Sequence, residues 1–218
     1  DGTKGTLMSD DKWTWAESAV TMNNIYAGES YDARKEQAGW STAKFGAQGW
    51  KAVQVTEENL PPHLVPQMMA PIRLLKAVKP VKTWRSPKGT WIIDFGINMA
   101  AVPRIKVNLP TGTTLKMCMA EYSIADTLNY WTTGPIATGH IQTDTYTCRG
   151  NGVETWTPRF TYHGFRYIEL SGIDNLPGGD WIEAVRVNTD VKAIGDFSCD
   201  NAMINRLHSM AVNTFLSN

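Results

Sequence analysis

The fold of this chain is decided by the stretch Thr161-Tyr162-His163-Gly164-Phe165-Arg166-Tyr167-Ile168-Glu169-Leu170. Apolar residues recur in it with a period of two, which is typical of a β-strand with one buried face. The alternation predicts that Phe165 and Tyr167 lie on one face of the strand and Ile168 on the other.

The same alternation extends through residues 90–187. Turn residues separate short apolar runs and no helical pattern intervenes, which favours an antiparallel, jelly-roll-like β-sandwich. The pair Asn151-Gly152 predicts a hairpin with a type I′ turn, because both residues tolerate positive φ angles. The predicted strands cover residues 91–95, 104–109, 114–119, 144–148, 165–170 and 181–187.

The two ends of the chain follow other patterns. Residues 1–70 carry tryptophans among glycines and short polar stretches, which predicts a partial second β unit that ends in an extended, proline-rich linker at 60–66. Near the C-terminus, Ser198 or Asp200 is a candidate N-cap for a helix. Its apolar stripe comprises Met203, Ile204, Leu207, Met210, Ala211 and Phe215. The sequence therefore predicts three parts, at residues 1–70, 71–192 and 193–218.

Composition excludes several classes of protein. Lysine plus arginine equals aspartate plus glutamate at 21 each, so no net field attracts nucleic acid or anionic lipid. No apolar run approaches the ~18 residues of a membrane span, and no signal-peptide pattern opens the chain. The chain starts without methionine and stops inside a helical pattern, which predicts a fragment of a longer protein.

Four blocks, taken in order, resemble one family. They are Asn23-Asn24-Ile25-Tyr26-Ala27-Gly28-Glu29-Ser30-Tyr31-Asp32-Ala33-Arg34, Asp94-Phe95-Gly96-Ile97-Asn98-Met99-Ala100, Phe160-Thr161-Tyr162-His163-Gly164-Phe165-Arg166-Tyr167 and Gly195-Asp196-Phe197-Ser198-Cys199-Asp200-Asn201. Together they are similar to the front half of bacterial α-L-rhamnosidases. The resemblance implies the end of an N-terminal jelly roll, a complete β-sandwich and the first helix of a catalytic (α/α)6 barrel.

The resemblance also implies an activity for the parent protein. Members of the family hydrolyse terminal α-L-rhamnosides with inversion, using a general acid and a general base about 6.5–9.5 Å apart. Both acids lie downstream of Asn218 in the family pattern, so no catalytic residue is expected here. Glu121, Glu154 and Glu169 are expected to be surface or cross-strand charges. The chain is therefore expected to brace the missing barrel, in a parent that acts on a rhamnose-containing glycan.

A sugar site is the alternative. Some family jelly rolls resemble a calcium-assisted rhamnose-binding module, whose ligands map to Asn23 and Asn24. Ca²⁺ takes six to eight oxygens, and because two neutral asparagines supply no charge, Glu29 and Asp32 are added to the candidate set. Trp40 is the candidate for stacking on a sugar ring. The competing interpretation makes Glu29, Asp32 and Arg34 an internal lattice that fixes a bend, with no cofactor required.

Besides Arg34, five residues of the resembling blocks are assigned structural roles, namely Asp94, Asn98, His163, Arg166 and Tyr167. Arg166 is expected to contact a carboxylate or carbonyl oxygen. Histidine is a common general acid–base group in enzymes, but no nucleophile motif accompanies His163, so a catalytic role is not expected for it.

Three functions remain open from the sequence: a bracing scaffold, a rhamnoside-binding module and a free-standing adhesion sandwich. Exposed tryptophans beside a calcium site would favour the second, whereas burial of Trp13, Trp15 and Trp40 would oppose it. Unless the apolar helix stripe is covered, it is expected to promote self-association. By analogy with the family, we expect a bacterial protein in the periplasm or secreted.

Overall fold

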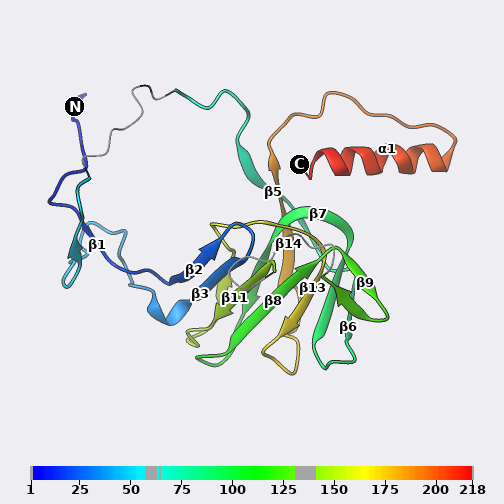
Figure 1. The fold of residues 1–218 in the computed structure, drawn as a ribbon, viewed down its shortest axis with the longest axis horizontal. Coiled ribbons are helices and arrows are strands. Elements are labelled where there is room, and N and C mark those ends of the chain that lie inside the picture. The colour runs from blue at the N-terminus through cyan, green and yellow to red at the C-terminus, as the bar shows by residue number, and fades with distance from the viewer. Residues whose placement is uncertain (1, 57–62, 64, 131–140, 218) are drawn as a thin grey trace.

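The structure is a computed structural model that describes residues 2–56, 63, 65–130 and 141–217 (Figure 1). Strands make up most of the regular structure in these residues, and one α-helix lies near their C-terminal end. The mainly β fold with a C-terminal helix is therefore confirmed. The strands are β1 (Thr14–Trp15), β2 (Val20–Asn24), β3 (Gly28–Asp32), β4 (Lys51–Ala52), β5 (Ile72–Val78), β6 (Lys82–Arg85), β7 (Trp91–Val107), β8 (Thr114–Ala120), β9 (Tyr122–Ile124), β10 (Thr127–Asn129), β11 (Thr143–Thr147), β12 (Glu154–Trp156), β13 (His163–Ser171) and β14 (Ile182–Thr189). The helices are a short 3-10 turn, η1 (Ala33–Lys35), and α1 (Ala202–Phe215).

Ten strands form one curled sheet. Its order is β2-β3-β11-β8-β13-β7-β14-β5, with β12 and β6 also paired to β7. Only the β3–β11 pair is parallel among the described strands of this sheet. The curl encloses a core of aliphatic and aromatic side chains, among them Phe95, Phe165 and Ile168, which are almost completely buried.

The long strand β7 is the centre of the sheet, because β6, β12, β13 and β14 all pair with it. Its pairing with β13 is interrupted: Phe165 faces Met99, but Tyr167 faces Asp94. The intervening residues of β7 bulge out of the ladder at Gly96, whose φ of +76° favours glycine.

This bulge corrects the predicted alternation in β13. Period two puts Phe165 and Ile168 on opposite faces, yet both side chains are buried in the same core cluster. The register shift between Phe165 and Tyr167 changes the phase of the strand, so its second half turns the other set of side chains inward.

The predicted hairpin at Asn151-Gly152 is also wrong. Strand β11 pairs with β3 and β8, whereas β12 crosses over to pair with β7. Glu154 causes the chain to turn away, since its carboxylate accepts hydrogen bonds from the Arg149 and Gly150 amides and from the Tyr146 hydroxyl. A type I′ hairpin is found instead between β9 and β10, where Ala125 and Asp126 both have positive φ.

The N-terminal region divides in two. Strands β1 and β4 form a separate two-stranded sheet, which lies away from the main sheet in Figure 1. Strands β2 and β3 instead extend the main sheet by pairing with β11. The predicted linker at 60–66 lies largely outside the described residues, and the division at residues 70 and 192 stays a prediction.

The N-cap of helix α1 is Asn201, whereas Ser198 or Asp200 was predicted. Asn201 caps it, because its Oδ1 accepts the Met203 and Ile204 amides, while Ser198 and Asp200 lie outside the helix. The helix contacts the body at its other end, where Asn213 donates to the Asn98 carbonyl oxygen (2.8 Å) and accepts from Arg186. No residue of α1 is buried. The apolar stripe is exposed, with Met203 and Phe215 about 70% accessible.

Gly28 gives a test of how tightly the β2–β3 hairpin is docked. A Cβ there would lie 2.2 Å from the Thr143 carbonyl oxygen, and its φ is +121°. Gly152 has a similar φ of +112° with nothing near its Cβ position. Both alanine variants incur about 1–3 kcal/mol of backbone strain, and we expect Gly28→Ala to lose about 1–3 kcal/mol more from the clash. Equal losses for Gly28→Ala and Gly152→Ala in urea unfolding would contradict the docked arrangement.

Candidate functional site

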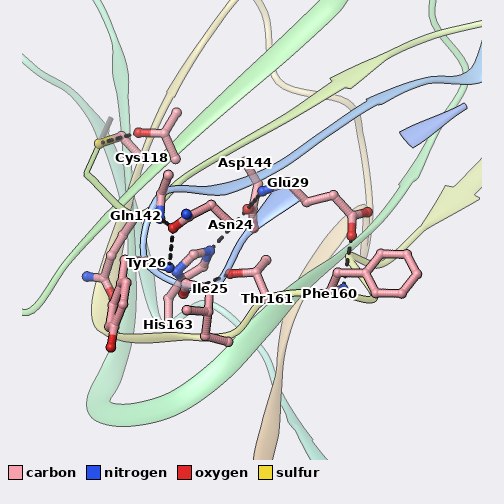
Figure 2. A network of polar contacts seen from close by, with 12 residues as sticks. Asn24, Ile25, Tyr26, Glu29, Cys118, Gln142, Asp144, Phe160, Thr161 and His163 are labelled. Atoms are coloured by element: carbon pink, nitrogen blue, oxygen red, sulfur yellow. Dashed lines mark hydrogen bonds and ion pairs between the residues drawn. The ribbon is translucent and has the colours of Figure 1, made fainter. Parts of the chain in front are cut away.

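Buried polar side chains from three distant segments meet where the β2–β3 hairpin docks (Figure 2). Glu29 of β3 has no exposed surface. Its Oε2 accepts the backbone amides of Arg159 (2.9 Å) and Phe160 (3.0 Å). Burial raises the pKa of the Glu29 carboxyl, because desolvation outweighs these two hydrogen bonds.

Asp144 of β11 lies at the centre of this cluster. Its Oδ1 accepts the Glu29 amide at 2.9 Å and lies 3.0 Å from His163 Nε2. Both the Asp144 and His163 side chains are completely buried. In the tautomer that carries its proton on Nε2, His163 donates to Asp144 Oδ1. His163 thus fixes a buried carboxylate, in keeping with the structural role predicted for it.

Gln142 closes the cluster on the side of β13. Its side-chain amide makes two hydrogen bonds to Gly164, one to the carbonyl oxygen (3.1 Å) and one from the amide (3.0 Å). Its own backbone amide donates to the Tyr26 carbonyl oxygen (3.2 Å), in the turn between β2 and β3. The N-terminal hairpin is therefore tied to both β11 and β13.

A second polar group holds the bulge of β7. Arg166 makes a two-pronged contact with Asp94, both distances being 2.8 Å, and Asp94 Oδ1 also accepts the Gly96 amide at 2.7 Å. Burial acts to raise the pKa of the Asp94 carboxyl, but the hydrogen bonds from Arg166 and Gly96 outweigh it and hold that pKa below its ordinary value. The expected carboxylate contact of Arg166 is thus present.

The other two residues assigned structural roles lie beside this bulge. Asn98 donates to Glu121 Oε1 at 2.9 Å, and its carbonyl oxygen receives Asn213 of α1. Tyr167 packs under the Arg166 guanidinium, 4.9 Å from its ring centre, and edge-on to Trp84. The bulge therefore also anchors α1.

Asn23 and Asn24 are the last two residues of β2, and the Asn24 side chain caps the turn that leads into β3. Asn24 Oδ1 accepts the Tyr26 amide at 2.9 Å and the Ala27 amide at 3.0 Å. Among the residues described, no group of three or more His, Cys, Asp or Glu side chains is arranged to hold a metal. Asn24 Oδ1 is thus already engaged by two backbone amides, and calcium binding at Asn23 and Asn24 stays a prediction.

The remaining candidate residues do not converge on one point. Asp32 caps η1 and pairs with Arg34 at 2.8 Å, but Glu29, the third member of the predicted lattice, is buried and accepts the Arg159 and Phe160 amides instead. Trp40 is 62% exposed. It lines a cleft of about 620 Å³ together with Trp50 and Phe160. Trp13 and Trp15 are also about half exposed, so none of these three tryptophans belongs to the core.

The carboxylates of the sandwich are engaged in structural contacts. Glu154 holds the turn after β11, and Glu169 accepts hydrogen bonds from Thr90 and Tyr130. Burial acts to raise the pKa of Glu154, but its hydrogen-bond donors outweigh that effect and lower it. Glu154 and Glu169 thus stabilise the fold.

Sequence reasoning missed Asp144 and Gln142. A signal was available for Asp144, because it occupies an alternating strand in which an unpaired acid would be costly to bury. No comparable signal marked Gln142.

Comparison with known proteins places this geometry in a family. The α-L-rhamnosidase N-terminal domain model matches residues 1–76, and the bacterial α-L-rhamnosidase concanavalin-like domain model matches residues 84–188. The chain belongs to the α-L-rhamnosidase family. It corresponds to the non-catalytic N-terminal and concanavalin-like part of that family.

Individual α-L-rhamnosidases are similar to this chain over nearly all of its length. An α-L-rhamnosidase of Formosa agariphila is 31% identical over the whole chain, which covers 23% of that relative. The structure of α-L-rhamnosidase from Dictyoglumus thermophilum is 38% identical, with a TM-score of 0.88 over 97% of this chain and 24% of its own. The Streptomyces avermitilis α-L-rhamnosidase complexed with L-rhamnose is 32% identical, with a TM-score of 0.89 over 96% of this chain and 20% of its own. The chain thus spans about a quarter of its relatives' length.

The Asp94–Arg166 pair predicts a dependence of stability on acid. Because the pKa of Asp94 is lowered on folding, its stabilisation is complete above the ordinary value of 3.8 and is lost as the pH falls through the folded value. At pH 7 we expect Asp94→Asn to lower the free energy of unfolding by about 1.5–3 kcal/mol. The difference in the free energy of unfolding between Asp94→Asn and the wild type should be smaller at pH 3 than at pH 7.

The matched control is Asp180→Asn, which breaks an exposed ion pair with Lys79. Exposed pairs contribute little to stability, so urea unfolding should give the same free energy as the wild type at both pH values. An Asp94→Asn deficit that stays constant between pH 7 and pH 3 would contradict the assigned role.

Proposed function

We propose that this chain is the part of an α-L-rhamnosidase that braces the catalytic barrel, in a protein that hydrolyses terminal α-L-rhamnosides with inversion. The observation that carries the proposal is the position of α1. This helix follows the sandwich directly, is held to it by Asn213, and presents an unburied apolar stripe. The stripe is the surface on which further barrel helices would pack.

The rigidity of the sandwich supports a bracing role. Asn213 is bonded to Asn98 on the β7 bulge, and the Asp94–Arg166 pair fixes that bulge. The first barrel helix is therefore anchored on the strand that pairs with four others. A helix end fixed in this way would set where the barrel, and the rim of its cleft, lie relative to the sandwich.

Two substitutions on the stripe test the bracing role. Leu207 and Met210 are more than half exposed, so Leu207→Glu with Met210→Glu should change the stability of residues 1–218 by less than about 0.5 kcal/mol. In a rhamnosidase polypeptide that carries a barrel after these residues, the same pair should lower the melting temperature and abolish hydrolysis of a p-nitrophenyl α-L-rhamnoside.

Arg206→Glu is the control, since it puts the same acid on the polar side of α1. It should leave both melting temperature and hydrolysis intact. Unchanged activity in the Leu207→Glu, Met210→Glu variant would contradict bracing through this helix. We further propose that the stripe drives self-association of residues 1–218 alone, which light scattering would detect and the double variant would abolish.

The exposed tryptophans favour a second candidate, binding of a rhamnoside. Trp40 lies at the surface of a cleft, and the Streptomyces avermitilis relative was crystallised with L-rhamnose. If Trp40 stacks on the sugar, titration calorimetry with L-rhamnose should give heat that Trp40→Ala removes and Trp13→Ala retains. Heat that disappears with a chelator and with Asn24→Ala would establish calcium assistance, against the geometry of the Asn24 turn.

A further inference from the structure

The Asn151-Gly152 pair, which forms no hairpin, occupies an open bend between β11 and β12. Both residues are exposed, and nothing lies within 4 Å of the position that a Cβ of Gly152 would occupy. The chain just before the pair is fixed, because the Gly150 amide donates to Glu154 Oε1. A Cβ on Gly150 would also lie 2.2 Å from the Thr111 nitrogen. A closely packed segment of chain therefore leads into a peptide bond that is open to solvent.

The backbone amide of Gly152 is available as a nucleophile. Among the residues that the structure describes, this amide has no hydrogen-bond acceptor. Gly152 has no side chain to hinder the approach of its nitrogen to the Asn151 carboxamide, and its φ of +112° lies in a region that glycine enters freely. Attack of this nitrogen on Asn151 Cγ is intramolecular, so no translational freedom is lost when the two groups meet.

Arg149 activates the group that is attacked. Its Nε donates to Asn151 Oδ1 at 2.9 Å, and a charged donor withdraws electron density from the carboxamide carbon. Negative charge develops on Oδ1 as the nitrogen attacks, so this hydrogen bond becomes stronger in the transition state. The guanidinium is itself held in place, because its Nη1 donates to Glu36 Oε2 at 2.9 Å. The bend thus combines an unbonded nucleophile with a polarised carboxamide.

We propose that Asn151 is a site of spontaneous deamidation in the folded chain. The Gly152 nitrogen loses its proton and forms a bond to Asn151 Cγ. The Cγ–Nδ2 bond breaks, and Nδ2 takes up a proton and leaves as ammonia. Water then adds to one of the two carbonyl groups of the resulting cyclic imide and opens it. Opening at one carbonyl gives aspartate, and opening at the other gives isoaspartate, whose main chain passes through the side-chain carbons.

The reaction would change the contacts of Arg149. A carboxylate would replace the Asn151 carboxamide that now accepts from Arg149, and it would compete with Glu36 for the guanidinium. Glu36 directly follows η1, so deamidation would weaken a contact between the N-terminal region and the chain after β11. The inference does not depend on the proposed function, because neither a barrel nor a sugar takes part in the reaction.

The test is incubation of residues 1–218 at mildly alkaline pH, followed by peptide mapping with mass spectrometry. Residue 151 should convert from asparagine to aspartate and isoaspartate, and an isoaspartyl methyltransferase should label the second product. Asn175 is the internal control. It is also exposed, but the branched side chain of Leu176 hinders the nitrogen that would attack, so Asn175 should keep its amide. Asn151→Gln should stop the reaction at this position, because ring closure would require a larger ring.

Arg149→Lys tests the activation of the carboxamide. Lysine keeps the positive charge but lacks the fixed Nε donor, so deamidation of the folded chain should slow about fivefold, as expected for the loss of one hydrogen bond. In urea the contact is absent from both proteins, and they should react at the same rate. The folded wild type should react at least as fast as the wild type in urea.

Two results would overturn the proposal. If Asn151 keeps its amide for as long as Asn175 does, the folded bend does not permit the attack. If the folded wild type deamidates at residue 151 much more slowly than the chain in urea, the bend protects Asn151. This second comparison uses the wild type alone, so it remains decisive even if Arg149→Lys fails to fold. Equal rates for folded wild type and folded Arg149→Lys would overturn the role assigned to Arg149.

Discussion

The carboxylate of Asp144 joins segments of chain that are more than a hundred residues apart. It receives the Glu29 amide and faces His163 Nε2, with no exposed surface on either side chain. A buried carboxylate is tolerated only when hydrogen bonds replace its lost hydration, and removal of one partner of such a pair typically costs about 3–5 kcal/mol. The parallel pairing of β3 with β11 depends on this contact, and so does the close approach of Gly28 to Thr143. The hairpin of the N-terminal region is thus part of the sandwich sheet.

Polar contacts also fix the position of helix α1 on the sheet. Asp94 and Arg166 hold a bulge in β7, and the bulge presents the Asn98 carbonyl oxygen to Asn213. One end of α1 is therefore fixed by the strand at the centre of the sheet, while its apolar stripe stays open. An arrangement in which polar groups set the position and an apolar face stays open is suited to receiving further helices.

Much of the fold could be predicted from the sequence, because burial of one face leaves a periodic pattern. Features that leave no such pattern could not be predicted. Period-two alternation located the main strands and the 3.6-residue period located α1, because burial of one face imposes both patterns. Alternation could not reveal the bulge at Gly96, so it misplaced Ile168 relative to Phe165. The Asn151-Gly152 turn was misjudged because Glu154 redirects the chain through contacts with Arg149 and Gly150 that no local rule anticipates.

The candidate site shows a similar division. Arg166 and His163 were assigned structural roles, and the structure places both against buried carboxylates. Of their two partners, Asp94 could be singled out from the sequence because it belongs to a block that resembles the family. Asp144 lies in no such block. Glu29 was considered both as a calcium ligand and as a member of an internal lattice with Asp32 and Arg34, whereas its carboxylate is fully buried and accepts the Arg159 and Phe160 amides. Long-range pairing decides such details, and a single sequence carries no direct record of it.

The contacts of Asp144 and Gln142 predict that the β2–β3 hairpin and the rest of the sheet unfold as one cooperative body. Native-state hydrogen exchange tests this directly, because the Glu29 amide, bonded to Asp144, reports opening of the hairpin and the Ile168 amide reports opening of the central sheet. We expect the two amides to exchange with the same opening free energy, equal to that of global unfolding. A Glu29 amide that exchanges through a much easier local opening, while Ile168 stays protected, would show that the hairpin is only loosely attached and would contradict the account.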